Sequence, residues 1–315
     1  QLKNNNPWFC LAAEEYLLKK FSEEIFMLWQ SHDTVVVGKH QNALAEINYP
    51  FVRENNIVVA RRISGGGTVF HDAGNVNFAF IKNVNDTSEI SLKKFTIPVV
   101  EALAKLHIPA EFSGRNDLLV KGKKISGNAE HVYKKRVLHH GTLLFDSNLQ
   151  NLGNAIRVIP GRYHGKAVQS NRSEVTNILP FLKTPMTTEA FRDFLMNVQL
   201  EQSGNTLYLL TQKDTAAINP LVEEKFKKWE WNFGYSPKYS FRNETVLQEK
   251  TLNIQLRVEK GWIAESDISG NYFSPKEAAY LNNILPGKRH YFEDIHEVLS
   301  EIDSGIGDQE VFAFV

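Results

Sequence analysis

The sequence predicts an α+β fold with one large and one small domain. Segments with helical spacing of apolar residues and segments with strand-like alternation are mixed along the chain. Its 315 residues are many for one core, because a domain usually holds roughly 100 to 200 residues. A polar stretch at 243–251 separates a long body from a short tail. We therefore expect domains over residues 1–245 and 246–315.

The first quarter of the chain is predicted to form a helix followed by short strands. Apolar residues recur at helical spacing over 8–21, and strand-like runs at 25–29 and 34–38 suggest a hairpin. A helix is expected near 44–55. The β-branched run at 57–62 then stops at a serine and three glycines, so the glycines should form a loop after a strand.

The middle of the chain alternates between strands and a helix. We expect a strand at 76–82, a helix at 92–106 and a strand at 139–145. Between the last two, residues 117–120 and 123–126 look like a hairpin around Lys121 and Gly122.

The last part should hold helices, a strand pair and more helices. Helices between 149 and 202 are interrupted by loops at 160–173 and 180–186, and the first loop is rich in Gly, Arg, Lys and His. Another helix is expected at 219–229. Strands lie within 252–267 around a turn at Lys260 and Gly261, and helices follow at 274–283 and 291–302.

Composition excludes several classes of protein. Lysine plus arginine and aspartate plus glutamate both number 36, which argues against a strongly basic nucleic-acid binder. A hydrophobic fraction of 42% excludes disorder as the main state. No apolar run reaches the roughly 18 residues that suggest a membrane span, and no secretory signal is evident. We expect no membrane partner and a monomer.

A single cysteine, Cys10, rules out an intramolecular disulfide and a cysteine-based zinc site. A reducing compartment, with the cytoplasm as default, fits this usage. Cys10 lies in an apolar segment without a nearby histidine, so we interpret it as a core residue rather than an acyl-accepting nucleophile.

The clearest chemical signal is RRISGGGTVFHDAGN, residues 61–75. Glycines bring backbone N–H groups close to a ligand, and arginines bind phosphate or carboxylate with two parallel bonds. This predicts an anion site, against the alternative of a turn beside two solvated arginines. The polar string Ser64, His71, Asp72, Asn75 and Asn77 favours the site. Neither the P-loop nor the dinucleotide fingerprint matches the spacing.

A second signal is GRNDLLVKGKKISGNAEH, residues 114–131. Lys124, just before an expected Ile-Ser-Gly turn, is our candidate for neutralising phosphate or carboxylate oxygens. The alternative is a hairpin lysine like Lys121 and Lys123. Asn116 and Asp117 could hold Mg²⁺ between ATP phosphates, or Asp117 could cap a turn.

Two adjacent histidines, His139 and His140, follow on an expected strand. Neighbouring side chains of a strand point to opposite faces, so at most one of the two faces the site, and they cannot jointly bind one metal.

Together with HHGTLLF at 139–145 and KWEWNFGYSPKY at 228–239, these motifs resemble the lipoate-protein ligase family of the two-domain bacterial type. The resemblance covers nearly the whole chain. It implies a large mixed-sheet catalytic domain of the biotin/lipoyl-ligase type and a small α/β C-terminal accessory domain. It also implies that lipoate and Mg-ATP give lipoyl-adenylate, whose lipoyl group passes to a carrier lysine.

The implied carriers are lipoyl domains of 2-oxoacid dehydrogenase complexes and the glycine cleavage H protein. The resemblance implies that Lys124 is the catalytic residue, and Asp117 is the candidate Mg²⁺ ligand. Motifs and resemblance together give these candidate binding residues: Arg62, Ser64, Gly66, Gly67, Thr68, Val69, Phe70, His71, Asn75, Asn116, Asp117, Lys124, His140 and Arg172. Core candidates for a lipoate tunnel are Trp29, Val36, Val76 and Phe78.

One position departs from the family pattern. In the segment NRSEVTN, residues 171–177, the family often has a second basic residue where this chain has Glu174, while Arg172 matches the first. The loop that binds the adenylate could therefore order differently in this chain.

Two alternatives to a complete ligase stay open. A lipoyltransferase that accepts preformed lipoyl-adenylate shares the same motifs, and a non-catalytic lipoate-binding module would keep the pocket without the chemistry. An octanoyltransferase is disfavoured because Cys10 does not match its nucleophile. A biotin ligase is disfavoured because Gly65, Gly66 and Gly67 are contiguous.

Overall fold

The computed structural model describes residues 1–86, 91–113 and 116–315 and divides them into two compact units. Unit 1 comprises residues 1–39, 57–154 and 170–228. Unit 2 comprises residues 40–56, 155–169 and 229–315. The domain division after residue 245 stays a prediction. Gly114 and Arg115, which open the second motif, lie outside the described residues.

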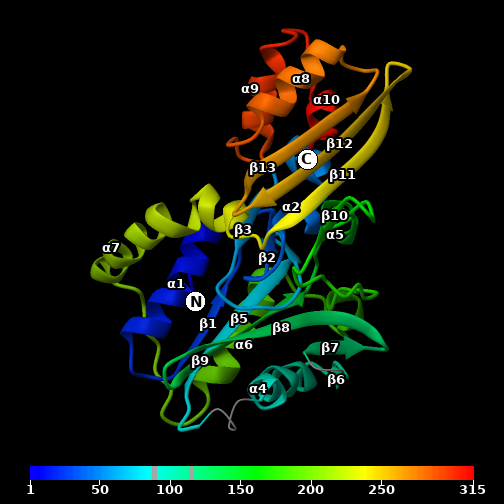
Figure 1. Ribbon diagram of the computed structural model, residues 1–315. Coiled ribbons are helices and arrows are strands. Elements are labelled where there is room, and N and C mark those ends of the chain that lie inside the picture. The colour runs from blue at the N-terminus through cyan, green and yellow to red at the C-terminus, as the bar shows by residue number, and fades with distance from the viewer. Residues whose placement is uncertain (87–90, 114–115) are drawn as a thin grey trace. The chain divides into compact units, whose positions relative to one another are not determined.

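Unit 1 is built on a six-stranded sheet whose neighbouring strands are all antiparallel. Its strands in spatial order are β1 (Ile25–Trp29), β5 (Asn75–Asn83), β9 (Arg136–Leu144), β8 (Lys123–Tyr133), β7 (Asp117–Val120) and β6 (Glu111–Ser113). Figure 1 shows β5, β9 and β8 crossing the middle of this unit. The α+β class is confirmed.

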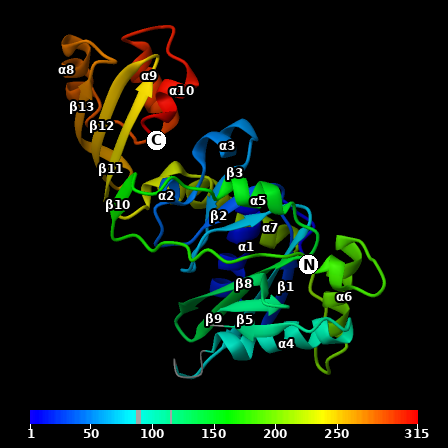
Figure 2. The same ribbon diagram turned by 90° about the vertical axis from the view of Figure 1, so that its right-hand side faces the viewer.

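One face of the large sheet is apolar and carries the main core. Helices α4 (Leu92–Lys105) and α6 (Thr188–Leu200) pack on it. Alternation along β5 sends Val76, Phe78 and Phe80 to this face, where they meet Leu103 and Phe191. The opposite face is covered by α1 (Pro7–Lys20), so that the sheet lies between α1 and α4 in Figure 2.

A second, three-stranded sheet in unit 1 has the order β3 (Val58–Arg61), β2 (Thr34–Val37), β4 (Val69–His71). Strand β2 is parallel to β3 and antiparallel to β4. The expected hairpin of residues 25–29 and 34–38 is wrong, because β1 pairs with β5 and β2 joins this other sheet. Strands β1 and β2 each pair with strands that lie further along the chain. The short connection between β1 and β2 therefore leads from the large sheet to the three-stranded sheet.

The hairpin of β7 and β8 is confirmed. Lys121 and Gly122 both have positive φ, 49° and 79°, as a two-residue turn requires. The expected turn at Ile125–Gly127 is wrong, because β8 continues through these residues to Tyr133. A register shift at Leu118/Leu119 absorbs the irregularity within the strand pair.

The remaining elements of unit 1 are mostly helical. They are α5 (Leu149–Ala155), whose last residue falls in unit 2, η2 (Leu179–Phe181), α7 (Gln212–Leu221) and the π-helical turn η3 (Val222–Phe226). Helix α7 starts earlier than the expected 219 because Thr211 and Asp214 form a capping box.

Unit 2 packs helices on a four-stranded antiparallel sheet. The strands in spatial order are β10 (Tyr163–Gly165), β11 (Tyr239–Leu247), β12 (Lys250–Glu259) and β13 (Trp262–Gly270). The helical segments are α2 (Ala43–Glu46), α3 (Tyr49–Glu54), η4 (Glu230–Gly234), α8 (Pro275–Ile284), α9 (Phe292–Ser300) and α10 (Asp308–Phe312). The single helix expected near 44–55 is divided: α2 ends before the extended residue Ile47, and α3 begins at Tyr49 with Pro50 in its first turn, where proline is favoured.

Strand β11 was not expected, although its buried residues Tyr239, Phe241 and Asn243 alternate with less buried neighbours. The turn at Lys260 and Gly261 is confirmed and has positive φ at both residues. Among the described residues no helix is long and apolar enough to cross a membrane.

Candidate functional site

Arg62 lies at the centre of the glycine loop and binds that loop from within. Its Nη2 donates to the carbonyl oxygens of Gly65 (2.6 Å) and Gly67 (2.7 Å), and its Nη1 donates to that of Val36 (3.2 Å). Nε donates to Ser64 Oγ at 3.0 Å. Burial lowers the pKa of Arg62 to about 10, so the group stays cationic at neutral pH. The loop is therefore wrapped around a buried positive charge.

The neighbouring Arg61 has a different role. It is completely buried, and its Nη1 donates to the carbonyl oxygens of Gly38 (2.9 Å) and Lys39 (3.1 Å). It therefore supports the connection that follows β2, and the two arginines are not equivalent.

The three contiguous glycines differ in what they require. Gly66 has φ of +83°, and a Cβ there would lie 3.1 Å from Arg62 Nη2. A Cβ on Gly67 would lie 3.1 Å from Ser170 Oγ, whereas one on Gly65 would meet nothing within 4 Å. Gly66 and Gly67 are thus constrained by the packing of the loop, and Gly65 is not.

A chain of buried hydrogen bonds links this loop to helix α1. Ser64 Oγ lies 2.6 Å from His140 Nε2, and His140 Nδ1 lies 2.8 Å from Glu14 Oε2. The other oxygen of Glu14 accepts from Trp29 Nε1 at 3.0 Å. Ser64 and His140 were both candidate binding residues, and the structure brings them into contact, whereas Glu14 was not among the candidates.

A signal for Glu14 existed in the sequence. Glu14 and Glu15 lie in the otherwise apolar helical segment LAAEEYLL, residues 11–18, and a buried carboxylate needs a partner. That partner is 126 positions away, so spacing could not identify it.

Ser64, His140 and Glu14 have the hydrogen-bond order of a nucleophilic triad, yet the arrangement is not suited to that reaction. Ser64 is completely buried, and its oxygen already accepts from Arg62 Nε. The trio serves to hold the loop.

His71 and two asparagines extend the polar cluster along β4 and β5. His71 Nδ1 lies 3.5 Å from both Ser31 Oγ and Asn77 Nδ2, and Asn75 Nδ2 donates to Asn77 Oδ1 at 3.0 Å. Burial, with smaller effects of Arg62 and His140, lowers the pKa of His71 to about 3. His71 is therefore a neutral ring at neutral pH.

The remaining residues of the first motif have structural positions. Phe70 is buried in the core, and Val69 pairs with Val36. Asp72 accepts from the backbone N–H groups of Gly74 (2.9 Å) and Asn148 (2.6 Å), which fixes the turn into β5.

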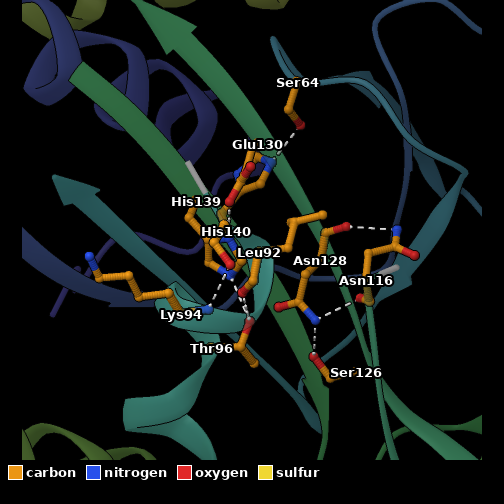
Figure 3. Close-up of polar contacts among 11 residues, drawn as sticks. Ser64, Leu92, Lys94, Thr96, Asn116, Ser126, Asn128, Glu130, His139 and His140 are labelled. Atoms are coloured by element: carbon orange, nitrogen blue, oxygen red, sulfur yellow. Dashed lines mark hydrogen bonds and ion pairs between the residues drawn. The ribbon is translucent and has the colours of Figure 1, made fainter. Parts of the chain in front are cut away.

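His139 and His140 point to opposite faces of β9, as expected. His139 Nδ1 lies 3.1 Å from Glu130 Oε1, and its Nε2 lies 3.2 Å from Thr96 Oγ1 of α4. Figure 3 shows these contacts beside those of Ser64 and of the Asn116–Asn128 pair. Only His140 belongs to the candidate site.

Lys124 lies near the start of β8, and its Nζ is 2.9 Å from Asp117 Oδ1 of β7. Both side chains are about one quarter exposed, at 23% and 24%. Next to this pair, Asn116 and Asn128 hold each other: each side-chain Nδ2 donates to the backbone carbonyl oxygen of the other residue. Asn128, which was not among the candidate residues, thereby fixes the backbone next to Asp117.

Segment 170–176 connects the β7–β8 hairpin, which carries Lys124, to the glycine loop of residues 62–68. Ser170 Oγ accepts from the N–H of Thr68 at 2.8 Å. Further on, Lys124 N donates to Glu174 O (2.8 Å) and Thr176 N donates to Lys124 O (2.9 Å). Segment 170–176 thus bridges both motifs. Arg172 on it is exposed.

Glu174 uses its charge locally. Its Oε1 lies 2.6 Å from Lys123 Nζ, in an exposed ion pair at the edge of the hairpin. The departure from the family pattern therefore creates a contact between segment 170–176 and β8.

Metal binding would rest on one carboxylate. Among the described residues there is no group of three or more His, Cys, Asp or Glu side chains that could hold a metal ion. Asp117 is partly exposed beside Lys124, which fits a Mg²⁺ ion that takes most of its ligands from phosphates and water.

Cys10 is a core residue. It is completely buried on α1, and burial, with the charge of Glu14, raises the pKa of its thiol well above the ordinary value. The thiolate needed by a nucleophile is therefore disfavoured.

Comparison with known proteins identifies two regions. Residues 6–199 match the Lipoyl protein ligase A/B catalytic domain, and residues 236–314 match the Bacterial lipoate protein ligase C-terminus. The lipoate-protein ligase LplJ of Bacillus subtilis is 39% identical over 95% of this chain and 92% of its own.

Solved structures agree in fold. P. falciparum LipL1 in complex with lipoate has a TM-score of 0.61 at 25% identity and covers 98% of this chain and 95% of its own. Lipoate-protein ligase A bound with ATP has a TM-score of 0.62 at 25% identity and covers 73% of this chain and 95% of its own.

Proposed function

The chain belongs to the lipoate-protein ligase family, and from this premise we propose that it carries out both steps of lipoyl attachment. In the first step a lipoate carboxylate oxygen attacks the α-phosphorus of ATP, which forms lipoyl-adenylate and releases pyrophosphate. In the second step the ε-amino group of a carrier lysine attacks the acyl carbon. An amide forms, AMP leaves, and the lysine loses a proton.

The observation that carries the proposal is the position of Lys124. Its ammonium group is partly exposed and held by Asp117, and its backbone is joined to segment 170–176, which contacts the glycine loop at Thr68. Attack of one anion on another requires positive charge and N–H donors at the reacting atoms. We assign Lys124 to both the lipoate carboxylate and the phosphate oxygens.

The loop around Arg62 supplies the backbone that would hold the nucleotide. Arg62 donates to the loop carbonyl groups. It would therefore act on the phosphates indirectly, by fixing the conformation of the loop and polarising its peptide groups. If Mg²⁺ accompanies ATP, Asp117 is the carboxylate that would hold it, and the ion would offset phosphate charge.

The proposed substrates follow from the family and from its relatives. Relatives have been solved with lipoate and with ATP, and we propose that this chain uses both. We propose as acceptors the lipoyl domains of 2-oxoacid dehydrogenase complexes and the glycine cleavage H protein, with the cytoplasm as the compartment.

A direct test is the exchange of labelled pyrophosphate into ATP. A complete ligase gives exchange that depends on lipoate, because adenylation is reversible. A transferase that needs preformed lipoyl-adenylate gives none from lipoate but modifies a carrier when the adenylate is supplied. A binding module does neither, and either of these two results would reject the proposal.

A further inference from the structure

We propose that Glu14 is a positioning residue that sets the direction of the buried hydrogen-bond chain and, through it, the shape of the glycine loop. The inference rests on the proposed function in assigning that loop to ATP. The chain runs from Trp29 and Glu14 through His140 and Ser64 to Arg62.

Both end groups of this hydrogen-bond chain can only donate. The indole N–H of Trp29 and the guanidinium of Arg62 have no acceptor capacity. Ser64 Oγ therefore accepts from Arg62 Nε. Among the described residues of the protein, His140 Nε2 is the acceptor that the Ser64 hydroxyl proton can reach.

It follows that His140 carries its proton on Nδ1. A neutral imidazole has one donor and one acceptor nitrogen, and Nε2 must accept from Ser64. Nδ1–H then donates to Glu14 Oε2, while Trp29 donates to Oε1. Glu14, as a carboxylate, is the one group in the chain that only accepts.

Replacing Glu14 by glutamine would create a conflict without changing the size of the side chain. If the amide oxygen keeps the bond to Trp29, the amide nitrogen faces His140 Nδ1, which must then accept. The proton moves to Nε2, so Ser64 Oγ receives two donors and its own proton loses its acceptor. The Arg62 contact that closes the loop is weakened as a result.

The test compares Glu14→Gln with Glu15→Gln, its neighbour on α1. Glu15 is also buried but is bound by Lys19 and Lys225, outside this chain. Ring-nitrogen NMR of ¹⁵N-histidine protein reports the tautomer, and the His140 signals are assigned by their loss in His140→Gln. Hydrogen exchange of peptides covering residues 62–71 reports the loop.

We expect an Nδ1–H ring for His140 in the wild-type protein and in Glu15→Gln. In Glu14→Gln we expect an Nε2–H ring, faster exchange in the loop and a KM for ATP raised about tenfold, as for one buried hydrogen bond left unsatisfied. Trp29→Phe removes a donor but keeps the Glu14 acceptor, so the tautomer should not change.

An Nε2–H ring in the wild-type protein would overturn the proposal, and so would unchanged ring signals and loop exchange in Glu14→Gln. If Glu14→Gln does not fold, the wild-type tautomer still decides, and a changed His140 tautomer in Trp29→Phe would also overturn the proposal. Tautomer and exchange are read without ligands, so they remain decisive even if the protein does not lipoylate a carrier.

Discussion

Arg62 and Lys124 show how two cations of one site are used differently. The Arg62 guanidinium is buried and donates to Ser64 and to the carbonyl oxygens of the loop. Lys124 has one carboxylate partner and is partly exposed. We interpret Arg62 as the group that shapes the loop and Lys124 as the group that meets substrate.

Lys124→Ala should remove adenylation, because its charge is the one we assign to the lipoate carboxylate and the phosphate oxygens. We expect the rate of carrier lipoylation from lipoate and ATP to fall at least about a hundredfold, a typical loss when a transition-state donor is deleted. Lys123→Ala is the matched control, since that lysine forms an exposed pair with Glu174. Equal rates for the two variants would remove Lys124 from the reaction.

Gly66→Ala should destabilise the loop while Gly65→Ala is tolerated. Alanine at the φ of Gly66 costs about 1–2 kcal/mol, and its Cβ would press on Arg62. Gly65 offers open space, so its change should stay within about 0.5 kcal/mol. Urea unfolding of both variants measures this difference, and a Gly66→Ala protein as stable as Gly65→Ala would contradict it.

Sequence motifs identified residues but not their contacts. Ser64, His71 and His140 were all candidate binding residues; Ser64 and His140 are in contact, and the charges of Arg62 and His140 act on the buried His71. Glu14 was missed because its partner is distant in sequence. The roles assigned to the individual candidates stay predictions.

Among the elements, local signals were reliable and long-range pairing was not. The hairpin turns at 121–122 and 260–261 follow from residue types that accept positive φ. By contrast, β1 and β2 looked like a hairpin but joined different sheets, because only the packing of distant segments decides which strands pair. The start of helix α7 was expected too late and strand β11 was not expected, because polar residues interrupt the apolar pattern in both segments.

Segment 170–176 contacts both motifs of the candidate site, at Thr68 and at Lys124. Ser170→Ala removes the acceptor for the Thr68 N–H. We expect faster hydrogen exchange in residues 66–70 and 170–176, and a loss of stability of about 0.5–1.5 kcal/mol. Ser173→Ala, on an exposed residue of the same segment, should leave both quantities unchanged. If both variants exchange alike, the contact with Thr68 does not hold the segment.

At the scale of the whole molecule, buried histidines should make the fold sensitive to acid. Burial, the largest cause, lowers the pKa of His71 to about 3 and that of His290 to about 4, below the ordinary 6.5. Both rings are neutral when folded. Between pH 6.5 and 4 the unfolded chain binds more protons, so stability is full above about pH 6.5 and falls as pH decreases.

Each of these groups contributes a slope of up to about 1.4 kcal/mol per pH unit in that window. Urea unfolding at pH 7.5, 6 and 5 measures the sum. His290→Gln should flatten the slope for unit 2, whereas His164→Gln, at an exposed position, should not. Stability that is constant or rises as pH falls would contradict this account.

The fold class and the family follow from motifs distributed over both units, whereas the arrangement of the site depends on contacts between segments far apart in the sequence. We propose that this chain both activates lipoate and transfers the lipoyl group.

The most direct test is the intact mass of an apo lipoyl carrier domain after incubation with this protein, lipoate, Mg²⁺ and ATP. We predict a mass increase equal to one lipoyl group that requires ATP. No increase with ATP, or an increase only when lipoyl-adenylate is supplied, would contradict the account.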